Sequence, residues 1–323
     1  MTRTSDARSL SPVCNVAIVG AGYMAREHIR AFQDIAGVQV VGIQSRTRKR
    51  AEDLAKEFGV AGVYDSVEQL YGGTGADLVV VTTPELQTNA VCDACFLHPW
   101  TALIEKPAGY NMEDASAIAA NAKARGSRAY VALNRRHYAS TRTMLADLAS
   151  IEGPRFIKLQ DQEDAVAALR AGQPPLVVEN WMYANSIHVI DYFTMLGRGK
   201  VVDVQRVVPW TPGSSYVVAK VTFDSGDLGI YEAVWNGPGP WAVTVNVREK
   251  RWELRPMERA AFQVAGKRVL EPVEPDPIDT QFKPGLRVQA ELAVRASRGE
   301  QTDLPTLDDA LASMRLTQAI YGV

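Results

Sequence analysis

The sequence has few cysteines, no long apolar run and no excess of charge of one sign. Its 323 residues include three cysteines, which are too few for a disulfide-stabilised scaffold. No apolar stretch approaches the roughly 20 residues that a membrane-spanning helix needs. The net charge of −2, with both signs scattered, predicts no basic surface for a nucleic acid. These absences favour a protein that acts on a small molecule, with no membrane or nucleic-acid partner.

The first 12 residues lack the apolar core of a secretion signal, and we expect them to form a loose N-terminal tail. The small number of cysteines fits a reducing compartment, so the sequence predicts a cytoplasmic protein. Apolar residues make up 46% of the chain, enough for the cores of two compact domains.

Cys92 and Cys95 form the CxxC pattern found in many zinc and redox sites. They lie in a helical run over residues 86–96, where two residues three apart share one face. A structural zinc site needs about four ligands, and the chain has one further cysteine, Cys14. We therefore predict two small residues facing the core, and no metal site.

Residues 13–135 alternate strand-length apolar runs with helical patterns. The runs are continuous in Val and Ile, as in strands buried on both faces, and repeated β-α units imply a doubly wound parallel sheet. We predict a Rossmann-type dinucleotide-binding domain here. The expected strands are 13–19, 38–43, 60–64, 77–81, 101–104 and 129–133, with helices that include 23–34, 47–58 and 111–125.

Residues 136–323 have a different pattern, which predicts an α+β domain for substrate binding and oligomerisation. Several strands alternate apolar and polar residues, as in an antiparallel sheet covered on one side. A face of that sheet needs a cover, which predicts a homodimer or homotetramer. The expected strands are 153–160, 201–208, 216–223, 228–235 and 242–247. The expected helices are 181–196, 283–297 and 307–321, and the last two are free to pack back on the first domain.

A GxGxxA pattern, Gly20 to Ala25, joins the first strand to the first helix. Gly20 permits a tight turn, Gly22 lets a pyrophosphate approach the backbone, and Ala25 allows close packing of helix on strand. The helix N-terminus, at Tyr23 and Met24, offers free N–H groups to phosphate. Its position between a strand and a helix in a βαβ series makes the pattern specific for a dinucleotide.

The end of the second strand selects between NAD and NADP. A carboxylate there binds the ribose 2′-hydroxyl, whereas an arginine accommodates a 2′-phosphate. The sequence places Ser45 and Arg46 there, with Arg50 nearby and no carboxylate before Glu52. A solvated basic helix face is the alternative interpretation, but the missing carboxylate favours NADP(H) as the cofactor.

The fourth and fifth strands end in Thr82-Thr83-Pro84 and Glu105-Lys106-Pro107, at the sheet edge where ligands bind in such folds. With the second-domain pattern, these motifs make the chain resemble the glucose–fructose oxidoreductase/inositol dehydrogenase (Gfo/Idh/MocA) family. The resemblance extends from Val13 to the C-terminus. Asn134-Arg135-Arg136 and the segment 304–310 also look like that family. The complete set expected at the cofactor is Gly20, Gly22, Tyr23, Met24, Ser45, Arg46, Arg50, Thr82, Thr83, Pro84, Glu105, Lys106 and Asn134.

The resemblance also implies the catalytic groups. Lys106 is expected beside the nicotinamide, where an ammonium stabilises the substrate oxygen as hydride moves. His188 matches the family histidine that exchanges the hydroxyl proton. The family commonly has Asp four residues before that histidine, whereas this chain has Ala184. Tyr183 or Asn185 is a candidate for the missing polar group, and Asp191 is expected to support His188.

The sequence therefore predicts an NADP(H)-dependent oxidoreductase that interconverts a ketone and a secondary alcohol on a sugar, cyclitol or related substrate. The substrate class is implied by the resemblance rather than by particular residues. Trp181, Tyr183 and Trp235 are candidates for an apolar wall against the substrate, or equally for the core.

Three alternatives stay open. One is a redox-neutral relative that retains its dinucleotide. Another is a non-catalytic dinucleotide sensor or scaffold, for which Ala184 is the argument. The third is an enzyme of the same fold that acts on an imine or a biliverdin-like ring system.

Overall fold

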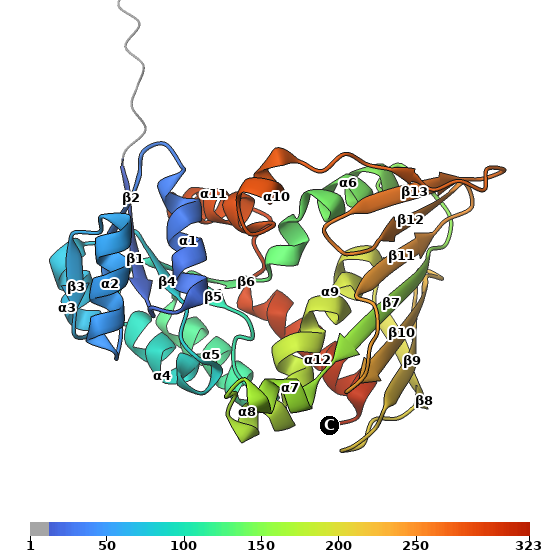
Figure 1. Ribbon diagram of the computed structural model, residues 1–323, viewed down its shortest axis with the longest axis horizontal. Helices are drawn as coiled ribbons and strands as arrows, with labels where there is room; N and C mark the ends of the chain where they lie inside the picture. The colour runs from blue at the N-terminus through green and yellow to red at the C-terminus, as the bar shows by residue number, and fades with distance from the viewer. Residues whose placement is uncertain (1–12) are drawn as a thin grey trace, which may run out of the picture.

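The computed structural model describes residues 13–323, so the predicted N-terminal tail lies outside the described residues. Two sheets lie at opposite ends of the molecule with helices between them (Figure 1). Within residues 13–323, no helix has both the length and the apolar character needed to cross a membrane.

The first sheet has six parallel strands in the order β3-β2-β1-β4-β5-β6. Its central strands are buried on both faces: in β1, Val16 and Ile18 enter one core cluster, while Ala17 and Val19 enter another. The predicted doubly wound parallel sheet is therefore confirmed. The strands are β1 (Cys14–Val19), β2 (Val38–Gln44), β3 (Gly62–Tyr64), β4 (Leu78–Val81), β5 (Thr101–Glu105) and β6 (Ala129–Ala132).

Helices cover both faces of this sheet. Residues of α1, α2 and the C-terminal helix α11 (Leu286–Ser297) share one core cluster with the strands, and residues of α3, α4 and α5 share the other. Cys92 and Cys95 of α4 are fully buried in the second cluster, which confirms their predicted role as small core residues. The helices are α1 (Tyr23–Gln33), α2 (Arg48–Phe58), α3 (Val67–Thr74), α4 (Glu85–Cys95) and α5 (Met112–Arg125).

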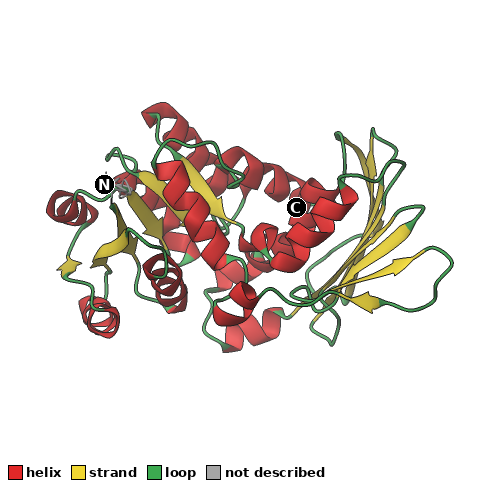
Figure 2. Ribbon diagram, turned by 90° about the horizontal axis from the view of Figure 1, so that it is seen from above, coloured by secondary structure: helices red, strands yellow, loops and turns green. Residues whose placement is uncertain are grey.

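The second sheet has eight strands in the order β14-β13-β12-β11-β7-β10-β9-β8. β7 and β10 are parallel and their other neighbours antiparallel, so the sheet is predominantly antiparallel, as predicted. Figure 2 shows this sheet nearly edge-on, with the helices along one of its two faces. The strands are β7 (Phe156–Glu163), β8 (Val201–Val208), β9 (Tyr216–Phe223), β10 (Leu228–Trp235), β11 (Ala242–Asn246), β12 (Lys250–Leu254), β13 (Ala260–Val264) and β14 (Glu271–Pro272).

The segment predicted as one helix over residues 181–196 differs from that expectation. It begins with a π-helical turn, η2 (Met182–Ser186), which continues as α9 (Ile187–Leu196). The sequence analysis also missed β12, β13 and β14, and the short helices that connect the two sheets. These are η1 (Asn134–His137), α6 (Ala139–Leu148), α7 (Ala165–Arg170), α8 (Pro175–Glu179) and α10 (Pro277–Gln281).

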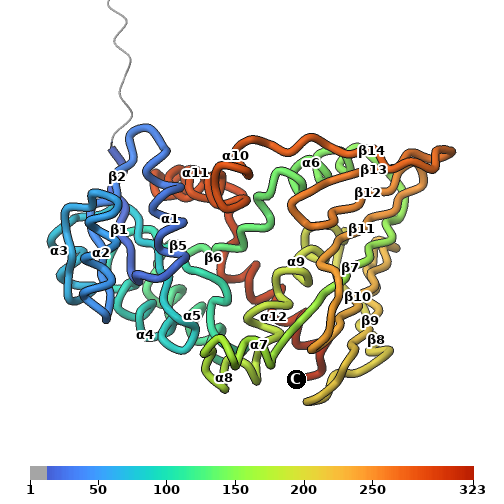
Figure 3. Tube along the Cα trace, viewed as in Figure 1, coloured from blue at the N-terminus to red at the C-terminus, as the bar shows by residue number. Residues whose placement is uncertain are grey.

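The two terminal helices, α11 (Leu286–Ser297) and α12 (Leu307–Tyr321), return the chain toward the first sheet. Figure 3 shows the chain running from the second sheet through α10 to α11, which lies beside α1. α12 packs against α5 and α9, and a capping box of Thr306 and Asp309 starts it. The terminal helices thereby connect the two sheets.

Candidate active site

A cavity of about 960 Å³ opens at the carboxyl ends of β1, β2, β4 and β5. The opposite side of the cavity is lined by residues that follow the first sheet in the sequence, among them Tyr138, His188 and Lys283. The cavity brings together every residue predicted at the cofactor, and His188 with them. Those residues are Gly20, Gly22, Tyr23, Met24, Ser45, Arg46, Arg50, Thr82, Thr83, Pro84, Glu105, Lys106 and Asn134.

The glycine turn has the backbone that a dinucleotide site needs. Gly20 has a φ of +113°, and a Cβ there would collide with Thr82. A Cβ on Gly22 would meet nothing within 4 Å, so this position is open. Gly22 also begins α1 without a side-chain cap, which leaves first-turn N–H groups free for an anion. The residues present therefore fit a pyrophosphate.

The basic segment after β2 divides into paired and unpaired cations. Arg48 forms ion pairs with Glu52 and Asp65, and Lys49 pairs with Asp53 at 2.6 Å. Arg46 and Arg50 line the cavity, and neither pairs with a carboxylate among residues 13–323. Two cations without acidic partners beside Ser45 fit a 2′-phosphate.

Lys106 follows β5 and reaches across to the second half of the chain. Its Nζ donates a 2.7 Å hydrogen bond to the carbonyl oxygen of Ala184, in the π-helical turn. Burial lowers the pKa of Lys106, although the neighbouring Glu105 and Glu85 favour its charged form. Glu105 itself bonds the buried His28 at 2.7 Å. The amine is thus anchored one helical turn before His188.

His188 lies at the start of α9 and lines the same cavity. Burial lowers its pKa well below the usual value, and the positive charges of Arg135, Lys106 and Lys283 lower it further. The imidazole is therefore neutral near pH 7 and able to accept a proton. Its Nδ1 is buried and has no hydrogen-bond partner in the described structure.

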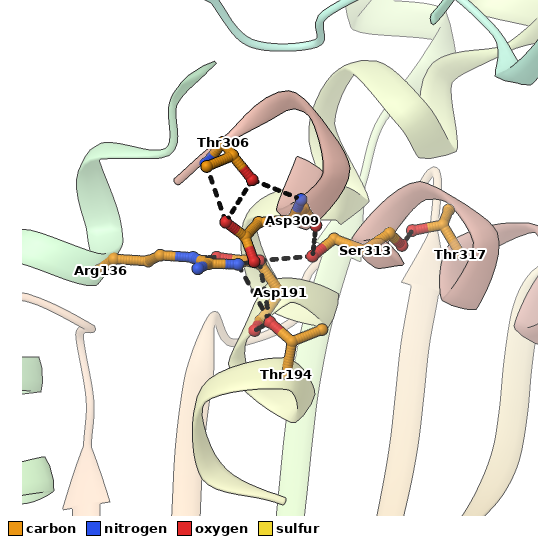
Figure 4. A network of polar contacts seen from close by, with 7 residues as sticks. All are labelled: Arg136, Asp191, Thr194, Thr306, Asp309, Ser313 and Thr317. Carbon is orange, nitrogen blue, oxygen red and sulfur yellow. Dashed lines mark hydrogen bonds and ion pairs between the residues drawn. The ribbon is translucent and has the colours of Figure 1, made fainter. Parts of the chain in front are cut away.

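Asp191 does not support His188, which corrects the sequence-based expectation. Its two oxygens accept hydrogen bonds from the Arg136 guanidinium at 2.7 and 2.8 Å, and Ser313 of α12 donates to it at 2.6 Å (Figure 4). Only 3% of the Asp191 side chain is exposed. Its role is to join η1, α9 and α12 where the two halves of the chain meet.

The aromatic residues predicted to form a substrate wall lie outside the cavity. Tyr183 and Trp235 are buried in the core of the second sheet, where Trp235 packs against Tyr321. Trp181 lines a second cavity of about 560 Å³ with Trp241, next to the first. Of the two alternatives that the sequence left open, Tyr183 and Trp235 therefore belong to the core, and Trp181 does not line the main cavity.

The polar surroundings of Ala184 come from strand β7. Asn185 and Ser186 each donate a 2.9 Å hydrogen bond to the buried carboxylate of Glu163. Burial and the neighbouring Asp161 carboxylate raise the pKa of Glu163 well above its usual value. The pair formed by Asp161 and Glu163 therefore retains a proton. Glu163 thus anchors the π-helical turn from behind, and Asn185 is engaged with it rather than free.

Among the cavity residues that sequence reasoning missed are Arg135, Tyr138 and Lys283. Arg135 lies over the ring of Trp241, with its Cζ 4.1 Å from the centroid, and Tyr138 is buried beside it. Lys283 lies over the ring of Tyr23. The motif around Asn134 contained the signal for Arg135, but nothing local marks Lys283, which precedes a terminal helix.

The model of an oxidoreductase family with a NAD-binding Rossmann fold, Gfo/Idh/MocA, matches residues 14–133. These residues belong to that family. Inositol 2-dehydrogenase 1 of Saccharopolyspora erythraea is 34% identical over 116 residues, which cover 35% of this chain and 34% of that protein. D-apiose dehydrogenase of Rhizobium rhizogenes is 26% identical over 102 residues, which cover 32% of this chain and 30% of that protein. The chain thus matches about a third of the length of these relatives.

Similarity of fold to solved structures extends over nearly the whole chain. A dehydrogenase from Chromobacterium violaceum superimposes with a TM-score of 0.83 at 17% identity, covering 97% of this chain and 95% of that one. The second sheet therefore belongs to the shared fold, although the family model matches only residues 14–133.

Proposed function

We propose that this protein is an NADP(H)-dependent oxidoreductase that interconverts a ketone and a secondary alcohol. The observation that carries the proposal is one cavity with two distinct ends. One end has the glycine turn and the unpaired Arg46 and Arg50, and the other has Lys106 and His188. A dinucleotide that spans the cavity would place its phosphates at the glycine turn and the two arginines, and its nicotinamide ring beside Lys106 and His188.

The cofactor supplies hydride chemistry at its nicotinamide ring, and the chain supplies the proton chemistry. Neutral His188 accepts the proton of a substrate hydroxyl, and the Lys106 ammonium stabilises the negative charge that develops on that oxygen. In the opposite direction the same groups polarise and protonate a carbonyl. The Ala184 carbonyl holds the amine in place for both directions.

The proposed substrate class is a sugar, a cyclitol or a derivative of one. The dehydrogenases of inositol and D-apiose that resemble the first domain support this class. We place the activity in the cytoplasm, because Cys14, Cys92 and Cys95 are all free and buried.

The experiment is a panel of cyclitols and aldoses with NADP⁺, and of the corresponding ketones with NADPH, followed at 340 nm. For an accepted substrate we expect Lys106→Gln and His188→Gln each to lower kcat by about 10²–10⁴-fold, since each removes a proton-handling or charge-stabilising group. The Kd for NADP(H) changes little in His188→Gln, and it is measured in Lys106→Gln to separate loss of binding from loss of turnover. Lys123→Gln, on the exposed face of α5, is the matched control and leaves kcat unchanged.

Other outcomes separate the alternatives. Full kcat in Lys106→Gln contradicts the proposed chemistry. A dinucleotide that copurifies with the protein but shows no net turnover indicates a redox-neutral relative. Reversible nucleotide binding without turnover on any substrate indicates a sensor or scaffold, and turnover confined to imines or linear tetrapyrroles indicates the third alternative.

A further inference from the structure

The reaction end of the cavity carries more positive than negative charge. Lys106 and Arg135 lie near His188, whose pKa is lowered by burial and also by the charges of these two residues and of Lys283 in the same cavity. The acidic residues that line the cavity are Glu85 and Glu105, and Glu105 is already bonded to His28. A neutral polyol would leave this excess of positive charge uncompensated.

Two adjacent arginines, Arg135 and Arg136, differ in their partners. Arg136 makes a two-pronged ion pair with Asp191, the geometry that a guanidinium favours with a carboxylate. Arg135 is partly buried in the cavity wall and pairs with no carboxylate among residues 13–323. Its Nη1 donates to the Met257 sulfur at 3.7 Å, a weak acceptor, and its side chain also bonds the neutral Tyr138 hydroxyl. Arg135 therefore has N–H capacity that the protein itself does not use.

The placement of Arg135 directs that capacity toward the substrate. Trp241 covers one face of the guanidinium at 4.1 Å, and the same indole lies 6.2 Å from the His188 ring. This cation–π contact holds the guanidinium against the indole and uses none of its N–H groups. Lys283 lies over the ring of Tyr23, the first residue of α1, and therefore borders the glycine turn. Arg135 is thus a cation close to His188 that has no carboxylate partner among residues 13–323.

We infer that the substrate carries an anionic group, a carboxylate or a phosphate, which pairs with Arg135 while its reacting carbon lies at Lys106. The inference rests on the proposed function and narrows its substrate class to acidic sugars, acidic cyclitols or their phosphates. The planar fork of Arg135 binds two oxygens of such a group, whereas a single hydroxyl satisfies one N–H.

The test is calorimetric binding of malonate and of inorganic phosphate, as separate probes, at constant ionic strength and with NADP⁺ bound. We expect at least one probe to bind, and Arg135→Gln to weaken it about tenfold or more, as expected for loss of a charge-assisted pair. Arg135→Lys keeps the charge but loses the fork, so it recovers only part of the affinity. Whichever of malonate and phosphate binds more tightly identifies the kind of anion.

Lys200→Gln is the matched control, because it removes the same charge from an exposed site outside the cavity and leaves anion binding unchanged. Binding of neither probe by the wild type, or equal binding in Arg135→Gln, overturns the inference. NADP⁺ affinity is measured first in every variant. If no nucleotide binds, the proposed function fails, and the anion titration on the nucleotide-free protein still decides the role of Arg135.

Discussion

Asp191 and His188 lie one turn apart on α9, but their surroundings give them different roles. Asp191 is held by Arg136 and Ser313 at the junction of three helical segments. His188 faces the cavity, and burial and three cations keep it neutral. Sequence spacing places both residues on one helix but cannot show which partners other elements bring to each.

Asp191→Asn tests this division. Removing one partner of a buried ion pair leaves the other charge uncompensated, so we expect a loss of about 3 kcal/mol in the free energy of unfolding, measured by urea denaturation. We expect the pH profile of kcat to keep its shape, because His188 has no bond to Asp191. A shifted profile in a variant of unchanged stability restores the supporting role that the sequence suggested.

The candidate site was predictable where a motif marks a strand end. Gly20, Ser45, Thr82 and Lys106 each follow a buried strand directly, so their meeting at one sheet edge follows from parallel topology. Arg135 and Glu163 were not predictable in the same way, because their roles depend on contacts with Trp241 and Asn185 that no local pattern encodes.

For the aromatic residues a usable signal was present. Tyr231, Ala233 and Trp235 occupy alternate positions of β10, and all three are buried against the helices. Period-two alternation on a one-sided sheet therefore assigns Trp235 to the core rather than to a substrate wall.

Elements were predicted best where they are long and apolar. The residue limits of β8, β9, β10 and α12 match those expected from the sequence. β12 (Lys250–Leu254) and β13 (Ala260–Val264) were missed because they are short, with charged residues within or close beside them. The π-helical turn has no propensity signal, since the residues of Met182–Ser186 suit an α-helix equally well.

At the outer edge of the second sheet, β8 exposes an apolar surface. Val202 is 61% exposed and Val207 56%, and Tyr216 on neighbouring β9 is also exposed. β8 is the last strand of the sheet and bonds to β9 on one side only. The exposed valines lie at the two ends of β8, with Asp203, Gln205 and Arg206 between them, and such an exposed apolar surface is a site for packing against another copy.

We therefore propose that the protein forms a homodimer or homotetramer through the exposed surface of β8. Sedimentation equilibrium at micromolar concentration tests this proposal. The wild type is expected to sediment as two or four chains, and Val202→Lys with Val207→Lys to shift it toward one chain. Lys220→Glu, on the neighbouring strand β9, is the control for a change of charge, and we expect it to leave the number of associated chains unchanged. A wild-type protein that sediments as one chain contradicts the proposal.

The whole molecule assembles its site from segments far apart in the chain. The glycine turn, the ends of β4 and β5, the start of α9 and the residue Lys283 all border one cavity. α11 and α12 join the two sheets from the far end of the chain, so the wall that carries His188 is held against the wall that carries Lys106. The account therefore depends on a dinucleotide spanning this shared space.

The most direct measurement is a fluorescence titration of the purified protein with NADPH and, separately, NADH. Because two unpaired guanidinium groups border the cavity, we expect NADPH to bind about 100-fold more tightly than NADH. Replacing Arg46 and Arg50 by Gln should abolish the difference, whereas replacing the paired Arg48 and Lys49 should preserve it. Equal affinity for NADPH and NADH, or no binding of either, would contradict the account.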